Sequence, residues 1–330
     1  EIYQCDWSSD VCSSDLYIVP INRLIIWLFQ VEVKMAKLLT REQNITRGKW
    51  LYRIQMIVPK FQRLFSGSKP KSPREEIFLD TEFGKVRTLW YGFDHREKVP
   101  IFFDLHGGGF ILGSADMDEP LNLEFNRRVG CKIISIEYAK APAFPYPAAV
   151  NQVYAVVSQV VEHAEEYAVD IKKMAIGGHS AGGNLSTVTC MKAKKEGRFQ
   201  FACQVLDYPP LDLATNPFEK PQPKGCIPPK MALIFNDSYV DPTQTRDPYV
   251  SPVYAAQEDL EGLPPALFIL AGRDSLHDEG VRYCDLLKAA GVVAECHDYP
   301  NAVHGFTLKP SVDTTDAVEK MTAFLRRYLD

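Results

Sequence analysis

Residues 176–184 read IGGHSAGGN, and this short stretch decides the fold. Its centre, GHSAG at 178–182, has the Gly-x-Ser-x-Gly pattern, in which a serine stands on a sharp turn from a strand into a helix. Glycines at both ends permit the turn, because bulky neighbours would clash there. A predicted strand precedes the motif and a predicted helix follows it, and the helix N-terminus offers N–H groups to developing negative charge. A glycine-rich turn without chemistry is the weaker alternative, and we interpret Ser180 as a nucleophile.

Strands and helices alternate on both sides of this turn. Short loops between them imply an α/β fold with a mainly parallel sheet and helices on both faces. Apolar runs predict strands at 99–105, 132–137, 173–176, 201–206, 266–270 and 294–298, with helices at 121–129, 148–167, 183–195, 278–290 and 312–329. Two further strands around Gly84 are predicted within 76–91, and a helix over 50–65 is expected to break or kink at Pro59.

Residues 211–264 interrupt this alternation with many prolines and few periodic runs. A loop-rich insertion of this length is usually functional, and with the amphipathic N-terminal segment it predicts a helical cap over the sheet. Along the chain we expect three parts. The first two are a non-native or disordered extension at 1–34 and an N-terminal cap segment at 35–75. The catalytic domain is expected at 76–330, with the cap insertion at about 211–264.

The first residues are unlike the rest of the chain. Residues 6–16 read DWSSDVCSSDL, and their back-translation fits a sequencing-library adapter, so we expect Met35 to be the natural start. Residues 17–33 are apolar-rich, but their uninterrupted apolar core is far shorter than the ~20 residues that a membrane-spanning helix needs. No small-residue cleavage site of a signal peptide is evident. Membrane association is therefore not expected.

Composition argues against several classes of partner. The 330 residues are 46% hydrophobic and 24% charged, with a net charge of −5 and no long basic run. Nucleic-acid and anionic-surface partners are therefore disfavoured. The eight cysteines have irregular spacing without a metal-site pattern, so we expect no metal and a reducing, cytoplasmic location. Five of them lie in or beside apolar segments and are predicted to be buried free thiols: Cys131, Cys190, Cys203, Cys284 and Cys296.

A second motif, HGGGF at 106–110, follows the predicted strand at 99–105. Successive glycines let backbone N–H groups approach a tetrahedral oxyanion without interference from side chains. A phosphate-binding loop would require a following Lys-Ser or Lys-Thr pair, which is absent. We interpret the glycines as part of an oxyanion hole.

A serine nucleophile needs a base, and the base needs an orienting carboxylate. His304, in NAVHGF, and Asp274, in AGRDSL, each follow a predicted strand, where open parallel sheets place their sites. With Ser180 they occur in the order Ser, Asp, His that this type of site requires. His277 and Asp278 are weaker alternatives, since Asp274 comes first after its strand.

The remaining histidines have other expected roles. His106 is expected to order the glycine loop rather than to act as the base. His179 flanks the nucleophile and is predicted to modulate it. The other three are expected at the surface: His95, His163 and His297.

Together these motifs resemble the hormone-sensitive-lipase-like family of esterases within the α/β-hydrolases. HGGGF, GGHSAGGNL, AGRDSLHDEG and the HGF around residue 304 occur in the family's order, and EYAKAPAFPYPAA at 137–149 is similar to its Tyr- and Pro-rich segment. The resemblance covers roughly 78–330 and implies an α/β-hydrolase fold with a helical cap. It assigns Ser180 as nucleophile, His304 as general base and acid, and Asp274 as its orienting partner. The implied oxyanion hole consists of the backbone N–H groups of Gly108, Gly109 and Ala181.

The resemblance also implies a reaction. We expect the protein to hydrolyse a small carboxylic ester with a short acyl chain, through an acyl-enzyme and without a cofactor. Amide or formamide hydrolysis is the alternative reaction, and a ligand-binding receptor is a weaker one, because such proteins lose the triad histidine. A homodimer is compatible with the resemblance. Two positions depart from the family pattern: His179 stands where an acidic residue is usual, and Ser275 replaces a common proline.

Overall fold

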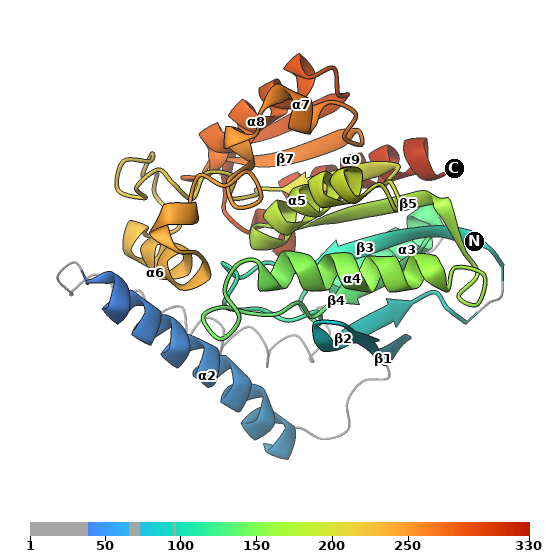
Figure 1. Ribbon diagram of the computed structural model, residues 1–330, viewed down its shortest axis with the longest axis horizontal. Helices are drawn as coiled ribbons and strands as arrows, with labels where there is room; N and C mark the ends of the chain where they lie inside the picture. Colours follow the sequence, from blue (N-terminus) through green and yellow to red (C-terminus); the bar gives the residue numbers. More distant parts are fainter. Residues whose placement is uncertain (1–38, 66–72, 95–96) are drawn as a thin grey trace. The chain divides into compact units, whose positions relative to one another are not determined.

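The computed structural model describes residues 39–65, 73–94 and 97–330 of the chain (Figure 1). Contacts divide the chain into two units, Glu1–Thr40 and Arg41–Asp330. Only residues 39 and 40 of the first unit are described, so the fold is that of the second unit. The adapter-like stretch at 6–16, the apolar segment at 17–33, Met35 and His95 lie outside the described residues.

The second unit contains an eight-stranded, mostly parallel sheet in the order β1-β2-β4-β3-β5-β6-β7-β8. Strand β2 pairs antiparallel with β1 and with β4, and every later pairing is parallel. Every residue of β4 and β6 is buried, as expected for central strands of a sheet that is covered on both faces. The strands are β1 Arg74–Thr81, β2 Gly84–Tyr91, β3 Val99–Leu105, β4 Lys132–Ile136, β5 Val169–His179, β6 Cys203–Asp207, β7 Ala266–Arg273 and β8 Ala294–Val303.

Helices cover both faces of the sheet, so the predicted α/β-hydrolase fold is confirmed. In Figure 1, α4 and α5 lie in front of the strands, whereas α3 and α9 lie behind them. Helix α8 shares the face of α5, because the side-chain oxygens of Thr187 and Tyr283 lie 3.0 Å apart between these helices. The helices are α2 Arg41–Phe65, α3 Glu119–Val129, α4 Ala148–Glu162, α5 Ala181–Glu196, α6 Pro229–Tyr239, α7 Gln257–Leu260, α8 His277–Ala289 and α9 Val312–Leu329.

Two predicted boundaries around β5 are wrong. Helix α4 ends at Glu162 rather than at residue 167, because the chain turns through Ala168, with φ +49°, to enter β5. Strand β5 then runs over Val169–His179 instead of 173–176, since it pairs with β3 along that strand's whole length. Gly177 and Gly178 are therefore strand residues, and the turn begins only after His179.

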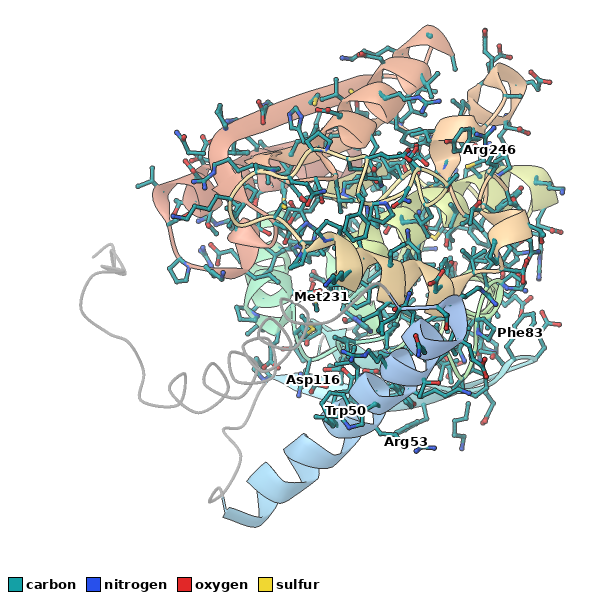
Figure 2. The ribbon with its side chains drawn as sticks, turned by 90° about the vertical axis from the view of Figure 1, so that its left-hand side faces the viewer. Trp50, Arg53, Phe83, Asp116, Met231 and Arg246 are labelled. Carbon is teal, nitrogen blue, oxygen red and sulfur yellow. The ribbon has the colours of Figure 1, made fainter. Side chains whose placement is uncertain are left out.

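Helix α2 is longer than predicted and does not break at Pro59. It begins at Arg41 and continues through Pro59 to Phe65. Helix α6, from the insertion at 211–264, packs beside the first half of α2, where the Asn44 amide donates to the Asp237 carboxylate at 2.8 Å. Figure 2, in which Trp50 marks α2 and Met231 marks α6, shows the two helices side by side.

The described cysteines are free thiols, as predicted, but they are not all buried. Cys296 is only half-buried, because β8 is an edge strand of the sheet. Among the described residues, no helix combines the length and the apolar character that crossing a membrane requires.

Candidate active site

Ser180 stands alone between β5 and α5, on a turn that its neighbours make very tight. Its φ of +51° and ψ of −118° lie in a region that non-glycine residues rarely adopt, and such strain is typical of functional turns. A Cβ atom added to Gly182 would lie 1.8 Å from the Leu105 carbonyl oxygen, and one on Gly178 would lie 2.1 Å from it. Only glycine fits at either position, so Gly178 and Gly182 permit this turn to pack against β3.

The structure brings together three residues that are far apart in the sequence. His304 Nε2 lies 3.0 Å from Ser180 Oγ, and His304 Nδ1 lies 2.5 Å from Asp274 Oδ2. Ser180 follows β5, Asp274 follows β7 and His304 follows β8, so the carboxyl ends of parallel strands bring them to one edge of the sheet. Asp274 is buried, whereas His304 keeps part of its side chain exposed. This chain of hydrogen bonds can carry a proton from the hydroxyl to the imidazole.

The alternative pair, His277 and Asp278, is engaged elsewhere. His277 Nδ1 lies 2.9 Å from Asp278 Oδ1, and its Nε2 lies 3.4 Å from Asp298 Oδ1. The geometry therefore favours Asp274 over Asp278 as the partner of the imidazole that faces Ser180.

The glycine loop after β3 presents unused N–H groups. Within the part of the chain that the structure describes, no residue accepts a hydrogen bond from the backbone N–H of Gly108, Gly109 or Ala181. The Gly108 carbonyl instead accepts from the backbone N–H of Leu112 at 2.8 Å, which curls the loop. Unpaired backbone donors near a serine are suited to bind an oxyanion.

His106 is buried beneath this loop. Its Nδ1 lies 2.7 Å from the Gly107 carbonyl oxygen, and its ring stacks on Tyr138 at a centroid distance of 4.2 Å. Burial, which is the largest cause, and the nearby Lys140 ammonium, which is the second, lower the pKa of His106 to about 3. A neutral, packed imidazole fits the expected role of ordering the loop.

The other histidines differ in exposure. His163 is exposed, as predicted, whereas His297 is half-buried. His179 is fully buried, and its Nδ1 lies 2.6 Å from Asp207 Oδ2.

Two residues next to the glycine loop were missed by the sequence reasoning. The Gln55 side chain of α2 donates to the Ile111 carbonyl at 3.1 Å and accepts from the Gly113 backbone N–H at 2.9 Å. The Phe235 ring of α6 lies against Gly109, where an added Cβ would come within 2.4 Å of it. No local pattern indicates such contacts, because each joins segments more than fifty residues apart.

Known proteins resemble the chain over most of its length. A family model described as the alpha/beta hydrolase fold matches residues 102–308. Esterase LipI of Mycobacterium tuberculosis is 31% identical over 70% of this chain and 74% of its own length, and carboxylesterase NlhH of the same organism is 34% identical over 64% and 67%. The structure of a hyperthermophilic esterase from Pyrobaculum calidifontis has a TM-score of 0.75 at 28% identity, covering 93% of this chain and 97% of its own.

Proposed function

The chain belongs to the hormone-sensitive-lipase-like family of α/β-hydrolases and is a carboxylic ester hydrolase; from this premise we propose that Ser180, His304 and Asp274 form its catalytic triad. The observation that carries the proposal is the continuous hydrogen-bond chain from Ser180 Oγ through His304 to Asp274. Each member has the role that its chemistry suits: hydroxyl nucleophile, imidazole base and buried carboxylate.

In the first step Ser180 Oγ attacks the ester carbonyl carbon while its proton passes to His304 Nε2. The carboxylate of Asp274 accepts from His304 Nδ1–H, which orients the ring and stabilises the imidazolium that forms. Negative charge develops on the former carbonyl oxygen, where the N–H groups of Gly108, Gly109 and Ala181 would donate to it.

The imidazolium then gives its proton to the leaving alcohol, which departs and leaves the acyl-enzyme; this completes the first half of the reaction. Water then attacks the acyl carbon, with His304 Nε2 taking a proton from it. Collapse of the second tetrahedral intermediate frees the acid and returns the proton to Ser180.

Short acyl chains are the proposed substrates, as the sequence resemblance implies. The aromatic ring of Phe235 lies against Gly109 and supports this proposal, because it narrows the space beside the oxyanion hole. Substitution Phe235→Ala is expected to shift the preferred ester in a p-nitrophenyl series towards longer chains. An unchanged preference would contradict the role given to Phe235.

Segment 35–75 and the insertion at about 211–264 are proposed to form a cap over the catalytic domain at 76–330. The pairing of α2 with α6 and the contacts of Gln55 and Phe235 with the glycine loop support this division. The free cysteines support a reducing compartment, proposed to be the cytoplasm. A homodimer remains a prediction that analytical ultracentrifugation can test.

The test of the triad is a comparison of the wild type with Ser180→Ala on p-nitrophenyl esters from acetate to palmitate. We expect Ser180→Ala to abolish turnover while the fold persists, and turnover in the wild type to fall as the acyl chain lengthens. An aryl formamide assayed in parallel tests the alternative amide chemistry. Ester turnover by Ser180→Ala at the wild-type rate would disprove the assignment.

A further inference from the structure

A cluster of buried ionisable side chains lies directly beside the nucleophile turn. Its centre is His179, the last residue of β5 and the neighbour of Ser180. Around it lie the carboxyl groups of Asp104 from β3, Asp118 at the start of α3 and Asp207 at the end of β6, all of them buried. Three carboxyl groups in an apolar interior require compensation, because an unpaired buried charge is very costly.

Two of these carboxyl groups lie within ion-pair distance of His179, one of each ring nitrogen. Its Nδ1 lies 2.6 Å from Asp207 Oδ2, and its Nε2 lies 3.6 Å from Asp118 Oδ1. Over the described ranges, His179 is the only basic side chain within ion-pair distance of Asp118 or Asp207. A neutral imidazole has one N–H group, so only the imidazolium presents a donor to both sides.

Asp118 has unusual surroundings for a buried carboxyl group. It is the N-cap residue of α3, yet its side chain does not cap the helix, and neither of its oxygens accepts a hydrogen bond from any described residue. Burial raises the pKa of Asp118 to about 7, while His179 opposes that rise. Burial alone would lower the pKa of His179, but Asp118 and Asp207 outweigh it and raise the pKa to about 10.

The same cluster reaches the loop that carries the base. The Thr307 hydroxyl, three residues after His304, donates to Asp207 Oδ2 at 2.6 Å. Tyr208 OH lies 2.7 Å from Thr307 Oγ1, and the Tyr208 ring packs edge-on against His304 at a centroid distance of 4.8 Å. The backbone also participates, because the Ser180 N–H donates to the Asp207 carbonyl at 2.8 Å.

We propose that His179 is a positioning residue: as an imidazolium paired with Asp118 and Asp207 at once, it holds the nucleophile turn in register with the segment before α3 and with the loop of His304. This inference rests on the proposed triad. The groups that face His179 from the surrounding elements are Asp104, Asp118, Asp207 and Tyr208. A carboxylate in place of His179 would add a fourth acid to a set without a cation, whereas a neutral amide would remove only the cation.

The test compares His179→Gln with His179→Asp and with the double variant His179→Asp/Asp118→Asn, which restores the number of carboxyl groups. We expect kcat on p-nitrophenyl acetate to fall in His179→Gln and to fall further, by about 10²-fold, in His179→Asp, because the reacting groups are displaced. KM should change little, and Asp118→Asn should recover part of the kcat that His179→Asp loses. The exposed His163→Gln serves as the matched control and should behave as wild type.

Two further measurements separate positioning from simple misfolding. Covalent labelling of Ser180 with a fluorophosphonate counts the competent sites in each variant, so kcat is expressed per labelled site. Nitrogen-15 NMR of the histidines, with the His179 signals identified by their loss in His179→Gln, should show both ring nitrogens protonated at pH 8.

A neutral His179 ring at pH 8, or equal kcat per site in His179→Gln and His179→Asp, would overturn the inference. Ser180→Ala is measured alongside these variants. If Ser180→Ala kept full turnover, the proposed triad would be wrong. If Ser180→Ala lost turnover as expected while the His179 variants kept the wild-type kcat per labelled site, only the role of His179 would be refuted.

Discussion

Replacing Gly109 by alanine tests whether helix α6 and the glycine loop are packed as tightly as the structure indicates. Gly109 has φ +60°, and a Cβ atom there would lie 2.4 Å from Cγ and Cδ2 of the Phe235 ring. Real Cβ atoms do not approach so closely, so either the ring or the loop must move. The left-handed backbone adds a cost of about 1 kcal/mol for any residue other than glycine.

The expected effect on catalysis follows from the role proposed for the loop. If the loop moves, the Gly109 N–H leaves the position in which it would meet the oxyanion. Loss of one such donor costs about 2.7–4 kcal/mol of transition-state stabilisation, or about 10²–10³-fold in kcat. Overpacking should also lower the free energy of unfolding by about 1–3 kcal/mol.

Gly130→Ala is the matched control. Gly130 ends α3 with a similar φ of +71°, but nothing lies within 4 Å of the Cβ position. It should lower the free energy of unfolding by about 1 kcal/mol and leave kcat unchanged. In the double variant Gly109→Ala/Phe235→Ala the overlap is removed, so part of the lost kcat should return.

The assay is steady-state hydrolysis of p-nitrophenyl acetate, with urea unfolding measured on the same preparations. The reasoning is refuted if Gly109→Ala keeps the wild-type kcat, or if removal of the Phe235 ring recovers none of the loss.

Three further predictions concern the triad, the loop and the buried cluster. Asp274→Asn should lower kcat by about 10⁴-fold with little change in stability, because an amide cannot stabilise the imidazolium of His304; wild-type turnover would contradict this. Gln55→Ala removes two hydrogen bonds from the glycine loop, each worth about 1 kcal/mol, and should lower kcat about tenfold; a change in KM alone would argue against it. The pKa of His179 is raised to about 10 from an ordinary value of 6.5, so the folded state holds a proton that the unfolded state has lost between these values. The contribution of this proton to the free energy of unfolding should therefore be complete below pH 6.5 and should fall as the pH rises towards 10, by up to about 1.4 kcal/mol per pH unit. Urea unfolding of His179→Gln should lack this pH dependence.

Much of the fold could be predicted because its signals are local. The pattern of apolar residues locates β3 and α9 at their observed boundaries. Three boundaries that failed lie where a distant partner decides them: β5 extends to Val169 because β3 offers it a pairing edge, and α4 stops early to deliver the chain there. Strand β8 runs to Val303 rather than to residue 298, because β7 pairs with it that far.

In the candidate site too, some residues could be predicted from local sequence and others depended on the fold. Residues 178–182 indicate the turn by their residue types and spacing, whereas the closest atoms that exclude larger side chains there belong to Leu105 of β3. Chain order suggested Asp274 and His304, but it left His277 and Asp278 as alternatives.

The sequence by itself determined the class of fold, the tight turn at Ser180 and the glycine loop, since each depends on residue type and short spacing. Only the tertiary structure decided which carboxylate meets His304, which residues of α2 and α6 contact the glycine loop, and what surrounds His179. Asp118 and Asp207 precede and follow His179 by 61 and 28 residues, counted along the printed sequence. Whether they meet it depends on the order of the strands in the sheet, and strand order is a property of the assembled chain rather than of any segment.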